Sequence, residues 1–320
     1  MANASAVTAV RRSPQAEPKR RTSPNKRKQY RAAYLFLLPF FIVFITMLVI
    51  PLVYAGYLSL FQSKLVGGDT FAGLANYVRA LTDPQFLSGL GNVALFFIVQ
   101  VPIMLGLALF FALALDSFRA RGSKGIRLLI FMPYAVPAVV ATLMWGYLYG
   151  PDFGPLAQMA RALGFGTPEF LSPENILGSM MNIVTWEFIG YNMIILYAAL
   201  RSIPGELYEA AEIDGAGQFR LAWSIKIPAI RPAIMLTVIF SIIGSFQLFA
   251  EPSLLNAIAP DAITNCFTPN YCAYNVAFIN QELNYAAALA FVLGLVIALI
   301  SYFVQLGTER SARRERKGLA

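Results

Sequence analysis

The sequence predicts an all-α membrane protein with six transmembrane helices. Of its 320 residues, 58% are hydrophobic and only 13% are charged, and the mean hydropathy is +0.60. A soluble domain carries nearer to a quarter charged residues, so this chain could not cover its surface for water. Six apolar runs are each long enough to cross a bilayer, which takes about 20 residues in a helix. Only one charged residue, Glu187, lies inside any of them.

The six runs divide the chain into a membrane domain and two tails. They are Tyr34–Leu60, Leu90–Leu115, Leu128–Tyr149, Ile176–Leu200, Ala233–Ala250 and Ala286–Leu306. Residues 1–31 are rich in Pro, Ser, Lys and Arg and are interpreted as a disordered basic tail. The apolar run that follows is too long for a cleaved signal and lacks a small-residue cleavage site, so we expect an uncleaved first span. Residues 32–307 then form the six-helix transmembrane domain, and residues 308–320 form a second basic tail.

The basic residues predict the orientation of the chain in the membrane. Of the 25 Lys and Arg residues, 22 lie in the two tails and in the loops 119–127 and 201–231. Only Lys64, Arg79 and Arg161 remain for the opposite side. The positive-inside rule therefore places both termini in the cytoplasm, as an even number of spans requires. We expect these basic residues to contact anionic membrane lipid and not nucleic acid, because they lie in tails and short loops beside spans.

Several kinds of chemistry are not expected of this chain. It has no G-x-x-x-x-G-K-[ST] phosphate loop and no His, so neither ATP hydrolysis nor a His-based catalytic site is predicted. We predict that the chain is not an enzyme and holds no cofactor. Its two cysteines, Cys266 and Cys272, lie in the last predicted external segment. The sequence leaves two alternatives for them, a disulfide bond or two free thiols. Two Cys without His do not make an ordinary four-ligand metal site, so no metal site is predicted.

One polar loop has internal organisation. The stretch from Glu209 to Pro232 reads EAAEIDGAGQFRLAWSIKIPAIRP and lies between two spans. Pro204 suits the first turn of a helix, Gly215 and Gly217 permit a sharp bend, and Pro228 is expected to end a second helix. The two predicted apolar faces are Leu207, Ala210 and Ala211 in the first helix, and Phe219, Ala222, Trp223 and Ile227 in the second. Two short helices at an angle form a knob that can enter the groove of a partner.

These residues resemble the EAA loop of the permease subunits of binding-protein-dependent ABC importers. The pattern of that family is Glu-Ala-Ala, three residues, Gly, nine residues and Ile-x-Leu-Pro, and here Ile227 replaces the Leu. Three further stretches are similar to elements of sugar-transporting members: FAGLANY at 71–77, FMPYAVP at 131–137 and FQLFAEP at 246–252. The residues expected to couple to the ATPase are Glu209, Ala210, Ala211, Asp214, Gly215, Ile225 and Pro228.

The resemblance implies the fold and the partners. The fold would be the type I ABC importer transmembrane domain, with a core permease region of about 86–306 and the coupling loop at 201–232. In such importers a second homologous permease subunit completes the pore, and two copies of a cytoplasmic ATPase drive it. ATP and Mg²⁺ bind to those ATPases, and an external sugar-binding protein delivers the substrate. By this resemblance Glu209 contacts a basic residue of the ATPase, and Gly215 allows the bend that lets the loop dock.

Two groups of residues are candidates for a sugar pathway. On the fourth run they are Trp186, Glu187, Tyr191 and Asn192, and on the fifth run Gly244, Gln247 and Glu251 share a face at i, i+3, i+7 spacing. Phe246 and Phe249 could offer rings to the apolar face of a sugar. An ionisable residue inside a span is a functional hypothesis. A structural hydrogen bond of Glu187 to the partner permease, and helix-end solvation of Gln247 and Glu251, stay open as alternatives.

Taken together, the sequence predicts a permease subunit that moves a disaccharide or short oligosaccharide. Within the family, the rival substrate is glycerol 3-phosphate or another small solute, and the loops show no external basic cluster for a phosphate. A rival from another class is a secondary transporter driven by an ion gradient. It would need titratable groups along its path, for which Glu187 is the sole candidate. A structural membrane scaffold would leave the EAA loop unexplained.

Overall fold

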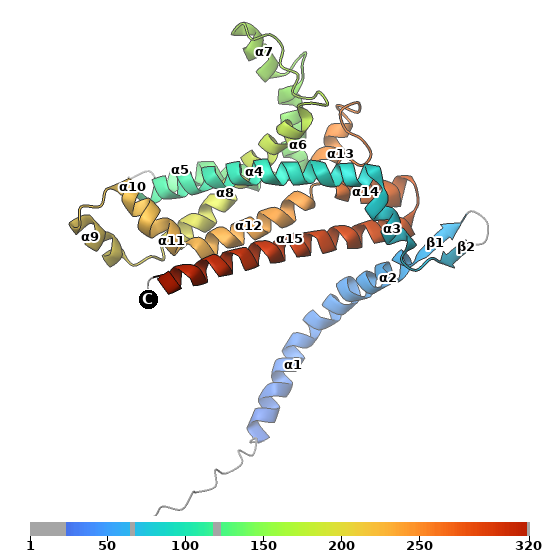
Figure 1. Ribbon diagram of the computed structural model, residues 1–320, viewed down its shortest axis with the longest axis horizontal. Coiled ribbons are helices and arrows are strands. Elements are labelled where there is room, and N and C mark those ends of the chain that lie inside the picture. Colours follow the sequence, from blue (N-terminus) through green and yellow to red (C-terminus); the bar gives the residue numbers. More distant parts are fainter. Residues whose placement is uncertain (1–23, 65–67, 118–122, 319–320) are drawn as a thin grey trace, which may run out of the picture. The chain divides into compact units, whose positions relative to one another are not determined.

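The computed structural model describes residues 24–64, 68–117 and 123–318 of the chain. The chain divides into two compact units, one up to Tyr54 and one from Ala55 onward. The described residues are mostly helical, with one short β-hairpin and several irregular connecting segments (Figure 1). The predicted all-α membrane fold is therefore confirmed.

The first unit is a run of helix. It contains α1 (Pro24–Phe44), a π-helical turn (Ile45–Val49) and the start of α2 (Ile50–Ser59). The apolar stretch long enough to span a membrane is Tyr30–Ser59, close to the prediction. Because α1 begins at Pro24, the end of the predicted disordered tail is helical, which corrects that prediction for these residues. The earlier part of the predicted tail lies outside the described residues.

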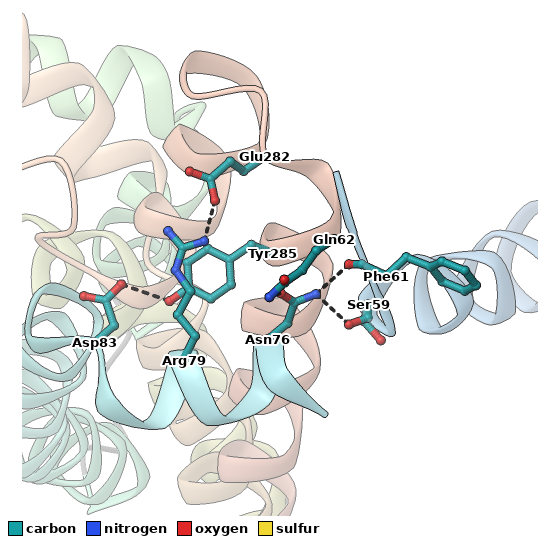
Figure 2. Close-up of polar contacts among 8 residues, drawn as sticks. All are labelled: Ser59, Phe61, Gln62, Asn76, Arg79, Asp83, Glu282 and Tyr285. Atoms are coloured by element: carbon teal, nitrogen blue, oxygen red, sulfur yellow. Dashed lines mark hydrogen bonds and ion pairs between the residues drawn. The ribbon is translucent and has the colours of Figure 1, made fainter. Parts of the chain in front are cut away.

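A hairpin and a short helix follow, and a buried amide joins them (Figure 2). Strands β1 (Phe61–Lys64) and β2 (Gly68–Phe71) pair antiparallel and precede α3 (Ala75–Thr82). The side chain of Asn76 donates to the carbonyls of Ser59 at 2.9 Å and Phe61 at 2.7 Å. Its oxygen accepts a hydrogen bond from Gln62 at 3.1 Å. Because its donors and its acceptor are all engaged, this buried side chain fixes the hairpin against α3.

Four of the long helices of the second unit agree with predicted spans. They are α4 (Pro84–Ser117), α8 (Ile176–Leu200), α12 (Arg231–Phe246) with α13 (Ala250–Asn256), and α15 (Leu283–Gly318). Within the described residues, five helices are long and apolar enough to cross a membrane, or six if one bent pair counts as a single span. Helix α15 continues to Gly318, so the backbone of the predicted basic tail is helical up to that residue.

The bent pair is the third predicted span. Helix α5 (Ser123–Phe131) with a 3₁₀ turn (Met132–Ala135) meets α6 (Ala138–Tyr149) at an angle of 94°. The sequence predicts a single run here, Leu128–Tyr149. The break lies at Val136, whose ψ of 128° is extended. The residue before a proline is pushed out of the helical region, and Pro137 follows it.

Helices α4 and α8 pack against each other along the C-terminal halves of both helices. Their buried contacts join Ala108, Ala112 and Leu115 to Met193, Leu196 and Leu200. Helix α5 approaches α8 at Gly190, where a Cβ atom would overlap the backbone carbonyl of Ile130. Only glycine fits this crossing, because the atom that it would meet is backbone and cannot move aside.

The predicted external segments include two short helices, α7 (Pro155–Ala162) and α14 (Pro269–Tyr274), the latter followed by a π-helical turn (Asn275–Ile279). In the structure, Cys266 and Cys272 form a disulfide. Thr268 Oγ1 accepts from the N–H of Tyr271 and donates to the carbonyl of Leu248 at 2.8 Å. Since Asn92 of α4 also donates to the carbonyl of Phe267 at 3.0 Å, this segment is tied to the helices beneath it.

Candidate functional site

The coupling loop has the two-helix form that the sequence predicts. Helix α9 (Gly205–Ile213) is followed by a bend and by a second helix made of α10 (Gln218–Leu221), a π-helical turn (Ala222–Lys226) and α11 (Ile227–Ala229). Figure 1 shows this loop at the end of the bundle where α5 begins. Gly215 has a φ of +77°, so the bend uses a backbone conformation that favours glycine.

Three details of the loop differ from the prediction. Gly217 has a φ of −70° and caps α10, so only Gly215 supplies the left-handed bend. Pro204 precedes α9 as its N-cap residue and is not in its first turn. Pro228 lies inside the second helix, which ends at Ala229. The π-helical turn before Pro228 shifts the hydrogen-bond register, which lets a residue without an N–H be included.

The loop exposes large apolar side chains. The exposed fractions are 86% for Ile213, 84% for Phe219 and 69% for Trp223. Glu209 and Asp214 are also exposed, whereas Ala211, Ile225 and Pro228 are partly buried. Exposed rings and aliphatic groups of this kind are a feature of surfaces that bind a protein partner. The individual roles of these residues stay predictions.

The base of the loop is polar and connected to a transmembrane helix. A cavity of about 590 Å³ lies beside it and is lined by Glu209 and Glu212 among others. Lys226 Nζ lies 2.6 Å from Asp116 Oδ2 at the end of α4, and both side chains are buried. Neither residue stands out in the sequence. Asp116 lies just beyond the predicted run Leu90–Leu115, where a charge ordinarily marks the end of a span.

A second cavity, of about 730 Å³, lies among the transmembrane helices. It is lined by parts of α4, α8, α12, α13, α14 and α15 together with the segment between α12 and α13. Five of the seven predicted pathway residues line it: Tyr191, Asn192, Gly244, Gln247 and Glu251. Its volume lies in the range of about 300–1,000 Å³ that is usual for small-ligand sites. Apolar and polar groups both face it, as a sugar requires.

Hydrogen bonds fix the polar groups of this cavity. Asn192 Nδ2 donates to the carbonyl of Phe188 at 3.0 Å, and Asn270 Nδ2 donates to the carbonyl of Gln247 at 3.0 Å. Gln100 Nε2 on α4 donates to Thr185 Oγ1 at 3.3 Å. Each of these amides keeps a carbonyl oxygen that can accept a hydrogen bond from a hydroxyl group.

The other two predicted pathway residues do not line the cavity. Trp186 packs edge-on against Trp145, with ring centroids 5.8 Å apart. Glu187 is buried, and its Oε2 atom has no hydrogen-bond partner among the described residues. Of the two predicted sugar-facing rings, Phe249 lines the cavity, whereas Phe246 is buried in the core. The prediction for Phe246 was wrong because this residue still belongs to the regular helix α12. It follows the cavity-lining Gly244 by two positions, which turns it about 200° away around the helix and into the core.

Several lining residues were not predicted from the sequence. They are Gln100 and Met104 on α4, Phe188 on α8, Phe240 and Ser241 on α12, and Asn270 in α14. Gln100 could have been predicted as a lining residue, since it is a polar side chain in the middle of a long apolar run. The others are apolar or lie in ordinary positions, so only the packing of the helices brings them to the cavity.

Residues 104–317 match the protein family described as "Binding-protein-dependent transport system inner membrane component". That range contains the coupling loop and nearly all of the cavity.

Among curated proteins, the diacetylchitobiose uptake system permease protein NgcF of Streptomyces coelicolor is 33% identical, covering 78% of this chain and 75% of its own. The lactose transport system permease protein LacF of Rhizobium radiobacter is 31% identical and covers 92% and 99%. The sn-glycerol-3-phosphate transport system permease protein UgpA of Brucella abortus is 30% identical and covers 88% and 94%.

Among solved structures, a chain of a bacterial alginate ABC transporter, crystallised in complex with an alginate pentasaccharide-bound periplasmic protein, superimposes with a TM-score of 0.80. It covers 89% of this chain and 96% of its own at 20% identity, and it therefore supports the fold alone.

Proposed function

Because the chain belongs to the family of inner membrane components of binding-protein-dependent transport systems, we propose that it is a permease subunit of an ABC importer for a neutral disaccharide or short oligosaccharide. The family is one of transport components that cross the membrane several times. The cargo, the partners and the orientation in the membrane are the finer parts of this proposal.

The cavity among α4, α8, α12, α13 and α15 carries the proposal for the cargo. Amide side chains and the ring of Phe249 face it, and no Lys or Arg is found among the described residues that line it. A phosphate or carboxylate ligand would lose its hydration there without gaining a cation, which costs free energy. A neutral sugar has no such penalty. The lining therefore favours the sugars of NgcF and LacF over the glycerol 3-phosphate of UgpA.

The coupling loop carries the proposal for the energy source. The exposed rings of Phe219 and Trp223 and the carboxylate of Glu209 would dock on a cytoplasmic ATPase, two copies of which bind ATP and Mg²⁺. An external binding protein would deliver the sugar, and a second homologous permease would form the other half of the pore. Alternating access would then be a rigid-body rocking of the two permeases, with the two states binding the ATPases differently.

The proposed orientation places both termini and the coupling loop in the cytoplasm. Its support is the distribution of basic residues, together with one contact. The ion pair between Asp116 and Lys226 joins the end of α4 to the coupling loop. This contact supports placing the end of α4 and the coupling loop on the same side of the membrane.

Uptake in cells tests the proposal. Labelled neutral disaccharides and labelled glycerol 3-phosphate would be supplied to cells with the wild type, Glu209→Lys or Gly215→Pro, and membrane level and ATPase pull-down followed in the same samples. We expect ATP-dependent uptake of a neutral sugar by the wild type, and loss of both uptake and ATPase binding in the variants at unchanged membrane level.

Other results would point to the rival functions. Uptake of glycerol 3-phosphate that neutral sugars do not compete with would favour the rival cargo. Uptake that persists without ATP and stops with an ionophore would favour an ion-coupled transporter and contradict the proposal, as would a wild type that binds no ATPase.

A further inference from the structure

A buried ion pair links the coupling loop to a cavity-lining helix. The ammonium group of Lys226 lies 2.6 Å from a carboxylate oxygen of Asp116, and the two side chains are 4% and 3% exposed. The residues are 110 positions apart in the sequence. By contrast, the ion pair between Arg79 and Glu282 is about half exposed, with fractions of 49% and 44%.

Two more elements meet at this pair. Lys226 Nζ lies 5.0 Å from the centroid of the Tyr208 ring, which belongs to α9. The hydroxyl of Tyr208 donates to the carbonyl of Leu200 at the end of α8, at 3.4 Å. Burial, and then the charge of Asp116, raises the pKa of Tyr208, so its hydroxyl keeps the proton that it donates. The ends of α4 and α8 and both helices of the loop are therefore joined at Lys226 and Tyr208.

Stability alone is a poor reason for such a pair. Two charges removed from water lose more hydration energy than a single contact readily restores, and apolar replacements of similar size are often as stable. A buried pair differs from an apolar contact in being directional, because it fixes the position of one group relative to the other. Asp116 and Lys226 therefore set the position of the loop relative to α4.

The course of α4 extends this constraint to the cavity. Asp116 lies in the last turn of α4, and Met104 and Gln100 of the same helix line the cavity. From Asp116 to Met104 is about 18 Å of continuous helix. On its way α4 packs against α8 through Ala108, Ala112 and Leu115. A displacement of the loop at Lys226 would therefore reach the cavity wall through one rigid element.

We propose that the Asp116–Lys226 pair is a latch that holds the coupling loop to α4, so that the loop and this wall of the cavity move as one body. This inference rests on the proposed function and deepens it. Asp116 and Lys226 are positioning residues that act through α4, and neither touches the cargo. The exposed side of the loop receives the motion of the ATPase, and the buried pair transmits it.

The number of sugar molecules taken up per ATP hydrolysed tests the latch. The complete transporter, with its partner permease and two ATPases, would be reconstituted in vesicles with the sugar-loaded binding protein. For Asp116→Asn and for Lys226→Gln we expect a fall on the order of tenfold in uptake per ATP, while the ATPases stay bound. The reversed pair, Asp116→Lys with Lys226→Asp, should recover part of the loss, which a general disturbance of the fold would not.

A second double variant keeps the test decisive if single variants do not fold. Asp116→Leu with Lys226→Met leaves no unpaired buried charge, so we expect it to assemble. It lacks the directional contact, and the latch predicts reduced uptake per ATP for it. Wild-type uptake per ATP in this variant, or in both single variants, would overturn the inference.

The control is the exposed ion pair. Glu282→Gln removes the same kind of contact at a site where a pair contributes little, and uptake per ATP should stay within about twofold of the wild type. If the wild-type complex moved no sugar at all, the proposed function itself would fail, and the latch with it. If the wild type transported sugar and the double variant Asp116→Leu with Lys226→Met showed the same uptake per ATP, the latch alone would be overturned.

Discussion

The guanidinium group of Arg79 lies over the ring of Tyr285, 3.7 Å from its centroid, and joins α3 to the first turn of α15 (Figure 2). The same guanidinium pairs with Glu282, and the hydroxyl of Tyr285 donates to Asp83 at 2.9 Å. Residues more than 200 positions apart in the sequence therefore meet beside the hairpin. Asn76 lies on the same helix α3 but is buried, and it bonds to Ser59, Phe61 and Gln62 instead.

This difference in burial predicts unequal effects of two substitutions. Asn76→Ala leaves one buried and one partly buried carbonyl without their donor and should lower stability by about 1–3 kcal/mol. Arg79→Met removes an exposed pair, which should cost about 0–1 kcal/mol after screening by solvent. Loss of the monodisperse protein on heating in detergent measures both. An Arg79→Met variant less stable than Asn76→Ala would contradict the view that burial of the amide dominates here.

Two glycines of α8 should respond oppositely to alanine. A Cβ atom at Gly190 would overlap the carbonyl of Ile130, whereas nothing lies within 4 Å of one at Gly178. Gly190→Ala should therefore lower the amount of folded protein in the membrane. Gly178→Ala should be neutral or stabilising by up to about 1 kcal/mol, because alanine is the better helix former. Protein level and heat stability, measured in parallel, test this, and equal tolerance at the two sites would refute the close approach of α5.

Much of the fold could be predicted from the sequence, because hydrophobic length depends on local composition. The run Ile176–Leu200 matches α8 in both bounds, and Tyr34–Leu60 differs from the observed span Tyr30–Ser59 by a few residues. The 94° break at Val136 was not predicted. In a membrane a proline can be accommodated within a helix or can break it, and neighbouring helices decide which.

The site was predicted less completely than the fold. The coupling loop was recognisable because its pattern is local and fixed in spacing. Residues such as Gln100 and Asn270 come together only through packing. Asp116 and Lys226 are 110 residues apart, and each looks like an ordinary charge at the end of a span. Regular helical spacing placed Gly244, Gln247 and Glu251 on one face. They do line one cavity, but the helix breaks between them.

The bend of the coupling loop should depend on one glycine. Gly215 has a φ of +77° and Gly217 a φ of −70°, with open space around both. A left-handed conformation costs most residues about 1–2 kcal/mol and costs Asn less. We therefore expect uptake to fall in the order Gly, Asn, Ala, Val at position 215. Gly217→Ala is the matched control and should transport normally. An equal loss at both positions would show that flexibility of the loop matters and not the angle of the bend.

Narrowing the cavity should reduce uptake without uncoupling the ATPase. Gly244 lines the cavity, and nothing lies within 4 Å of a Cβ atom placed on it, so a larger side chain would extend into free space. We expect Gly244→Ala to slow uptake slightly and Gly244→Leu to slow it strongly, with ATPase association unchanged. Longer oligosaccharides should be affected more than disaccharides, because the loss is one of volume. Gly106→Leu adds the same side chain on α4 at an exposed position that does not line the cavity, and it should transport normally. If Gly244→Leu took up sugar as fast as Gly106→Leu, the sugar would have to pass elsewhere. That result would contradict the assignment of this cavity as the pathway.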